Sequence, residues 1–190
     1  AVLTELRIDE PVVMMGHSFG GAIAVTFAYR HPEKVKRLAL AATTGKYVLP
    51  FYTRALLSLP VPVLNALRPL FRSSISSTPA TLTRFYKNAM KPWVGWDMMR
   101  DLTMPTLVIR GDRDFLFPEA DFEQVAKIIP HAEEVNVGVS AHMVILERSE
   151  AVRRAIERFL GVGTASWRAS DVEAERSRLI AERPWIKLYD

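Results

Sequence analysis

PVVMMGHSFGG, residues 11–21, is the stretch of this sequence that decides its fold. Its apolar first half is bounded by Pro11 and Gly16 and is typical of a buried parallel strand. The small and apolar residues 20–29 predict a helix directly after it, which stops near Pro32. Strand, sharp turn and helix in immediate succession place Ser18 at the turn of an α/β unit.

The sharp turn at Ser18 explains why glycines stand two residues before and two residues after it. A serine on a strained strand-to-helix turn projects its oxygen above the sheet, and side chains at Gly16 and Gly20 would collide there. The following helix points its first N–H groups at the site, so the N–H of Phe19 is predicted to bind a developing oxyanion. His17 adjoins Ser18, but neighbours at a sharp turn point in different directions. We therefore interpret His17 as a scaffold residue and not as a base.

The rest of the chain alternates strands and helices. Further strands are predicted at residues 35–42, 106–110 and 133–137, and helices at 120–129 and 144–160. Residues 45–101 have no strand pattern and carry apolar residues at helical spacing, which predicts a helical insert. This alternation predicts a parallel α/β sheet built from right-handed crossovers.

Candidate partners for Ser18 follow two of the later strands. Asp112 and Asp114 come after the strand 106–110, and His142 comes after the strand 133–137. Loops at the carboxyl ends of parallel strands are where α/β folds place function. By position alone, both aspartates can serve as the acid that orients a histidine base.

These motifs resemble those of the serine α/β-hydrolases. Asp114 falls in the Gly-x-x-Asp slot of that family, with Pro118 four residues on, so the resemblance implies Asp114 as the acid and Asp112 as a solvated turn residue. His142 resembles the family's histidine loop and is implied as the base, with Ala141 in place of the usual glycine and a helix carrying Glu147 after it.

The order Ser18, Asp114, His142 is also that of the family. The resemblance covers roughly residues 1–160, and it implies a parallel-sheet α/β-hydrolase fold with Ser18 as nucleophile. Haloalkane dehalogenases and epoxide hydrolases of this fold have Asp at the nucleophile position, so those reactions are disfavoured here.

The resemblance also predicts how the chain is divided. Residues 1–44 and 102–160 would form the hydrolase core, 45–101 a helical cap, and 161–190 a linker, a charged helix and a tail. The family's second oxyanion N–H comes from a loop after an early strand, whereas only 17 residues precede Ser18. We therefore expect a fragment whose fold lacks its N-terminal strands.

The leading function is hydrolysis of a carboxylic ester of an apolar substrate through an acyl-enzyme, since the insert is rich in apolar side chains. Thioesterase, C–C hydrolase, perhydrolase (haloperoxidase) and acyltransferase activities fit the same scaffold, and a non-catalytic ligand-binding relative is a further alternative. No metal or cofactor is implied.

Composition excludes several other classes. The chain has no cysteine, so it can form neither a disulfide framework nor a thiolate metal site. Its net charge of +4 is dispersed, without the dense basic run that tracks nucleic acid. No apolar run reaches the ~20 residues that span a bilayer. A cytoplasmic location is favoured.

The tail carries a second, shorter resemblance. Pro184, Trp185, Lys187 and Tyr189 are similar to the opening of long-chain acyl-CoA synthetases. This favours the hypothesis that a hydrolase is fused to an acyl-activating domain. The alternative is a C-terminal tail whose aromatic side chains pack back onto the hydrolase domain.

Overall fold

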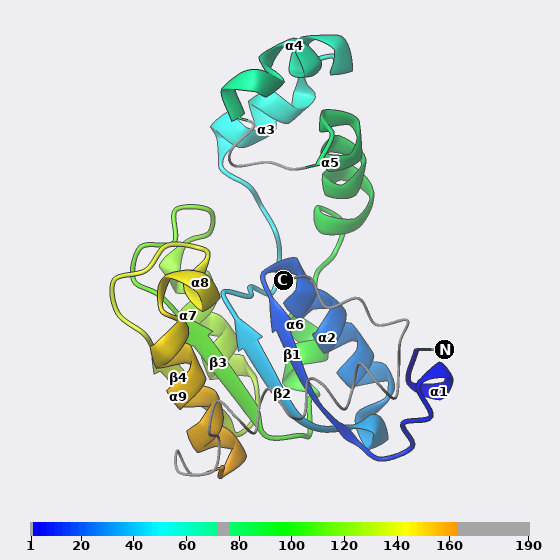
Figure 1. Cartoon of the computed structure of the whole chain (residues 1–190), viewed down its shortest axis with the longest axis vertical. Coiled ribbons are helices and arrows are strands. Elements are labelled where there is room, and N and C mark those ends of the chain that lie inside the picture. Colours follow the sequence, from blue (N-terminus) through cyan, green and yellow to red (C-terminus); the bar gives the residue numbers. More distant parts are fainter. Residues whose placement is uncertain (1, 72–76, 163–190) are drawn as a thin grey trace, which may run out of the picture. The chain divides into compact units, whose positions relative to one another are not determined.

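A computed structural model of the chain describes residues 2–71 and 77–162 (Figure 1). In chain order its elements are α1 (Val2–Glu5), β1 (Val12–His17), α2 (Phe19–Arg30), η1 (Pro32–Lys34), β2 (Val35–Ala41), α3 (Phe51–Ser58), α4 (Val61–Phe71), α5 (Pro79–Phe85), η2 (Tyr86–Met90), α6 (Trp96–Arg100), β3 (Thr106–Arg110), α7 (Glu119–Ile128), β4 (Ala132–Asn136), α8 (Val144–Glu147) and α9 (Ser149–Leu160). Strands and helices alternate as predicted, and the predicted α/β class is confirmed.

The four strands form one parallel sheet in the order β1-β2-β3-β4. Parallel pairing requires a crossover between successive strands, and α2 and α7 provide two of these. The central strands β2 and β3 are almost entirely buried. All four strands therefore end at the same edge of the sheet, the edge where an α/β fold presents its loops.

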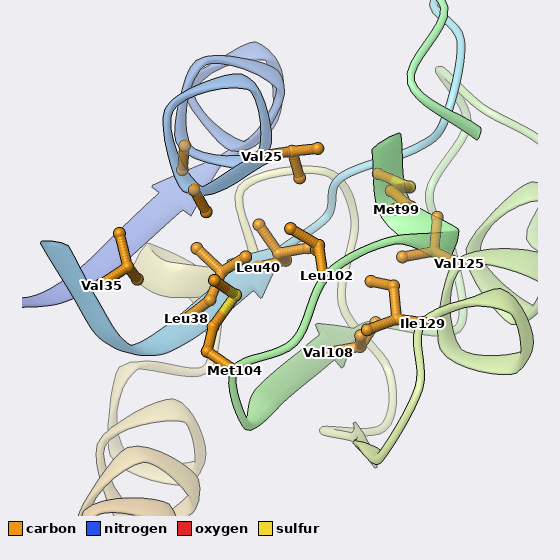
Figure 2. Packing of buried hydrophobic residues seen from close by; sticks show 12 residues of the cluster. Val25, Val35, Leu38, Leu40, Met99, Leu102, Met104, Val108, Val125 and Ile129 are labelled. Atoms are coloured by element: carbon orange, nitrogen blue, oxygen red, sulfur yellow. The ribbon is translucent and has the colours of Figure 1, made fainter. Parts of the chain in front are cut away.

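One face of the sheet is covered by α2, α6 and α7, whose apolar side chains meet those of β2 and β3 (Figure 2). Val25 of α2, Met99 of α6 and Val125 of α7 are completely buried there, together with Leu38 and Leu40 of β2. This layer fixes the position of α2 on the sheet, and thereby the turn that precedes α2.

β1 is less buried than its apolar sequence predicts. Val13 and Met15 are 47% and 42% exposed. Side chains alternate between the two faces of a strand, so these residues lie on the face opposite Met14, which packs against the core. The prediction of a buried strand is wrong for this face in the described structure, since both side chains are exposed there.

In its described residues, 45–71 and 77–101, the predicted insert contains the helices α3, α4, α5 and α6 and the π-helical turn η2. Its two ends are tied together by an antiparallel bridge between Lys46 and Val94 and by the Gly95 N–H, which donates to the Gly45 carbonyl at 2.8 Å. The helices α3, α4 and α5 lie between these ties along the chain, whereas α6 follows them and contributes Met99 to the core.

Two predictions for the C-terminal part have different outcomes. The single helix predicted at 144–160 is wrong, since α8 and α9 are separated at Arg148, whose φ of −130° and ψ of 40° are not helical. The predicted charged helix and the acyl-CoA synthetase-like residues 184–189 lie outside the described residues.

Across residues 2–71 and 77–162, no helix combines the length and the apolar character needed to cross a membrane.

Candidate active site

Three strand ends bring together the residues singled out in the sequence. Ser18 follows β1 directly, Asp114 lies in the loop after β3, and His142 lies in the loop after β4. The carboxyl ends of parallel strands share one edge, so residues more than a hundred positions apart in sequence become neighbours.

The three side chains form a continuous hydrogen-bonded series. His142 Nε2 lies 2.7 Å from Ser18 Oγ, and His142 Nδ1 lies 2.7 Å from Asp114 Oδ2. The His142 and Asp114 side chains are only 11% and 5% exposed. A serine, an imidazole and a carboxylate in this geometry can move a proton from the hydroxyl to the imidazole while the carboxylate fixes the ring.

The carboxylate of Asp114 is held at both oxygens. While Oδ2 faces His142, Oδ1 accepts the backbone N–H groups of Leu116 at 2.9 Å and of Phe117 at 3.3 Å. Asp112 is exposed, and its carboxylate accepts a hydrogen bond from the side-chain amide of Asn136. Of the two candidate acids, Asp114 is therefore the one in contact with His142.

The loop that carries His142 is held by hydrogen bonds to Glu147, a residue of the helix α8 that follows the loop. Glu147 Oε2 accepts the N–H of Ala141 at 2.7 Å and the hydroxyl of Ser140 at 3.3 Å. The Arg113 N–H donates to the carbonyl of Ser140 at 2.9 Å, which ties the histidine loop to the acid loop. These bonds hold the backbone next to His142 in place, and thereby position the imidazole relative to Ser18 and Asp114.

His17 contacts the same loop. Its Nε2–H donates to the backbone carbonyl of His142 at 2.8 Å. Burial is the main cause that lowers the pKa of His17 below its usual value, which favours the neutral ring, and the contact with the carbonyl then requires the tautomer with the proton on Nε2. The contact agrees with the interpretation of His17 as a scaffold residue.

Ser18 occupies a strained backbone conformation, with φ of 53° and ψ of −128°. Non-glycine residues rarely adopt positive φ, and each such residue costs about 1–3 kcal/mol, which the surrounding structure must offset. A Cβ at Gly16 would lie 2.5 Å from both the Gly20 carbonyl oxygen and the Gly21 Cα. Gly16 therefore has to be a glycine because the start of α2 passes directly over it.

The expectation for Gly20 is wrong within the described structure. A Cβ there would meet nothing within 4 Å, because Gly20 is exposed at the start of α2. The next residue, Gly21, makes the close approach: its Cβ would lie 2.0 Å from Thr43 Oγ1. Sequence analysis missed Gly21 because its crowding comes from the segment after β2.

The two glycines of the motif should therefore respond differently to alanine. We expect Gly16→Ala to lower the free energy of unfolding by about 1–3 kcal/mol or more, because its clash is with backbone atoms. Gly20→Ala should leave it unchanged or raise it by up to about 1 kcal/mol, since alanine is the better helix former. Urea denaturation of both variants tests this, and equal destabilisation would contradict it.

Aromatic rings surround the turn. The ring of Phe19 lies 5.0 Å from that of Phe85 in α5 and 5.2 Å from that of Tyr47, measured between centroids. The Phe117 ring lies 5.5 Å from the His142 ring. A hollow of about 310 Å³ adjoins the acid loop, and its lining is mostly apolar: Val48, Pro50, Asp114, Phe115, Leu116, Phe117 and Pro118. Apolar surface thus lies directly beside the hydrogen-bonded side chains of Ser18, His142 and Asp114.

Two further residues reach the turn from the segment after β2. The hydroxyl of Tyr47 donates to the backbone carbonyl of Ser18, and the hydroxyl of Thr43 shares its one proton between that carbonyl and the carbonyl of Ala41. Sequence analysis did not single them out, because no motif marks them. Among the described residues, no group of three or more His, Asp or Glu side chains is arranged to hold a metal ion.

Comparisons with known proteins agree with this architecture. A family model described as alpha/beta hydrolase fold matches residues 1–58. The chain is 28% identical over 172 residues to a poly(3-hydroxyalkanoate) depolymerase of Ectopseudomonas oleovorans, covering 78% of this chain and 60% of that protein. It is 29% identical over 196 residues to a 2-hydroxymuconate semialdehyde hydrolase of Pseudomonas putida, covering 86% and 67%. The chain therefore spans 60–67% of the length of these two relatives.

Solved structures show the same fold. A thermophilic esterase of Thermogutta terrifontis aligns with a TM-score of 0.65 and 22% identity, over 84% of this chain and 68% of that one. An enol-lactonase of Burkholderia xenovorans LB400 aligns with a TM-score of 0.62 and 21% identity, over 84% and 69%. At these identities the likeness is one of fold.

Proposed function

We propose that this chain, which has the α/β-hydrolase fold, carries the catalytic side chains of a serine hydrolase acting on a carboxylic ester of an apolar substrate. The observation that carries the proposal is the pair of 2.7 Å contacts that joins Ser18, His142 and Asp114. Such a series activates a hydroxyl that is otherwise a weak nucleophile.

In the proposed first step, Ser18 Oγ attacks the ester carbonyl carbon while His142 Nε2 takes the hydroxyl proton. Asp114 keeps the imidazole in the tautomer that presents an unprotonated Nε2, and it stabilises the imidazolium that forms. The oxyanion accepts the N–H of Phe19 at the start of α2. His142 then returns its proton to the leaving alkoxide, which departs as an alcohol and leaves an acyl-serine.

In the second step, water attacks the acyl-serine carbonyl and His142 accepts the proton of the water. Collapse of this tetrahedral intermediate breaks the bond to Ser18 Oγ, which recovers its proton from His142. The carboxylic acid is released and the hydroxyl is restored.

An apolar substrate is supported by the surface beside the site. The mostly apolar hollow next to Asp114 and the aromatic rings of Phe19 and Phe85 offer contacts to an acyl or alkyl chain and few polar ones. Ligand sites of this kind combine an apolar lining with a few placed polar groups.

A second oxyanion donor, which the family resemblance implies, is part of the proposal. We propose that it comes from polypeptide that covers the edge of β1, outside the described strands. In support, β1 is an edge strand of the described sheet, and an unpaired edge favours association; the apolar side chains of Val13 and Met15 are also exposed on one of its faces.

The test is a series of p-nitrophenyl esters with acyl chains of increasing length. We expect a burst of p-nitrophenolate equal to the enzyme concentration when deacylation is slow, and kcat/KM rising by up to about 4-fold per added CH₂, the equivalent of roughly 0.8 kcal/mol per buried methylene. A fluorophosphonate should label Ser18. Turnover without labelling of Ser18 would show that another residue is the nucleophile.

A C–C hydrolase is the second candidate, favoured by the 29% identity to the 2-hydroxymuconate semialdehyde hydrolase. Assaying 2-hydroxymuconate semialdehyde beside the esters separates the two. If it is cleaved and every ester is inert, the ester proposal is wrong and the second candidate replaces it.

A further inference from the structure

The backbone carbonyl of Ser18 is held by three donors. It accepts the hydroxyl of Tyr47 at 2.7 Å, the N–H of Gly21 at 2.9 Å and the hydroxyl of Thr43 at 3.3 Å. The Gly21 bond lies within the turn itself, whereas Thr43 and Tyr47 belong to the segment that follows the neighbouring strand β2. The turn is therefore braced from outside its own α/β unit.

Tyr47 is a fixed donor. It is completely buried, and its ring lies 5.2 Å from Phe19, 5.3 Å from Phe117 and 5.6 Å from Trp93, measured between centroids. Packing on these sides leaves the phenol little freedom to turn. Burial raises the pKa of Tyr47 far above its usual range, so the hydroxyl keeps its proton and donates it.

We propose that Tyr47, assisted by Thr43, is a positioning residue for the nucleophile. The inference rests on the proposed function, in which Ser18 attacks the substrate. A residue keeps a rare backbone conformation only where several surrounding contacts hold it there. Ser18 is such a residue, and the two hydroxyls bind its carbonyl while its Oγ faces His142. Neither hydroxyl takes part in the reaction, and both act through the backbone of Ser18.

Removing the Tyr47 hydroxyl should lower kcat much more than it changes KM. Tyr47→Phe removes one oxygen atom and keeps the ring, and a nucleophile displaced by about 1 Å loses roughly 100-fold in rate. We expect kcat to fall about 10- to 100-fold, with KM changed by less than about 3-fold. Thr43→Val should cost less, since its bond to Ser18 is longer and its hydroxyl is also 3.2 Å from the Ala41 carbonyl.

The experiment measures the second-order rate of fluorophosphonate labelling of Ser18, per folded molecule as judged by circular dichroism. Wild type, Tyr47→Phe and the matched control Tyr29→Phe are compared. Tyr29 is an exposed tyrosine at the other end of α2, and its variant should label at the wild-type rate. Tyr47→Phe should label about 10- to 100-fold more slowly.

A purely structural role for Tyr47 would lower the melting temperature and leave this rate unchanged, which would overturn the inference alone. A wild type that is not labelled at Ser18 would overturn the proposed function, and the inference with it. If Tyr47→Phe does not fold, Thr43→Val and Thr43→Ser decide the matter. Valine should slow labelling and serine, which keeps the hydroxyl, should restore it, while equal rates in the two would overturn the inference.

Discussion

Ser18→Ala should lower kcat for ester hydrolysis by about 10⁴- to 10⁶-fold and abolish fluorophosphonate labelling, as loss of a nucleophile does in serine hydrolases. The variant removes only Oγ, the atom that lies 2.7 Å from His142 Nε2. KM should change by only a few-fold, because the apolar contacts proposed to bind the substrate do not involve this oxygen. Steady-state kinetics with a p-nitrophenyl ester, together with mass spectrometry of the labelled peptide, measure both effects.

A matched control is Ser58→Ala, which removes an exposed hydroxyl that donates to a carbonyl of its own helix, α3. It should keep wild-type kcat and labelling, since surface substitutions away from special features change little. If Ser18→Ala kept most of its activity while another serine carried the label, Ser18 would not be the nucleophile and the proposed mechanism would be wrong.

The strand at residues 106–110 was predictable because its sequence is a short apolar run between Pro105 and Gly111. The strand predicted at 106–110 has the bounds of β3, and that predicted at 133–137 differs from β4 by one residue at each end. The break at Arg148 was not predictable in this way. Neither Gly nor Pro marks the point where α8 ends.

Contacts between segments explain the other differences. The glycine motif does not tell which glycine is crowded, because the crowding at Gly21 comes from Thr43, a residue in another segment. Likewise, the apolar sequence of β1 predicts burial, but burial of Val13 and Met15 depends on what covers them. The Tyr47 hydroxyl reaches Ser18 across 29 positions of sequence, and no local pattern signals it.

Asp114→Asn should lower kcat by about 10⁴-fold at pH 7, the loss that follows when an imidazole is held in the wrong tautomer. The reason lies in the second oxygen of the carboxylate. Oδ1 accepts the N–H groups of Leu116 and Phe117, so the amide oxygen of the asparagine should take that position and its NH₂ should face His142 Nδ1. The ring must then carry its proton on Nε2, where it can no longer accept the proton of Ser18.

The matched variant is Asp112→Asn, which makes the same chemical change two residues away. Asp112 is exposed and accepts the Asn136 amide through one carboxylate oxygen, a role that an amide oxygen can also fill. We therefore expect its kcat to stay within about 3-fold of wild type, as for other exposed substitutions that touch no reacting group. Comparing kcat at pH 7 for the two variants measures the difference. A larger loss in Asp112→Asn than in Asp114→Asn would assign the acid to Asp112, because only the carboxylate that fixes the His142 tautomer can produce a loss of this size.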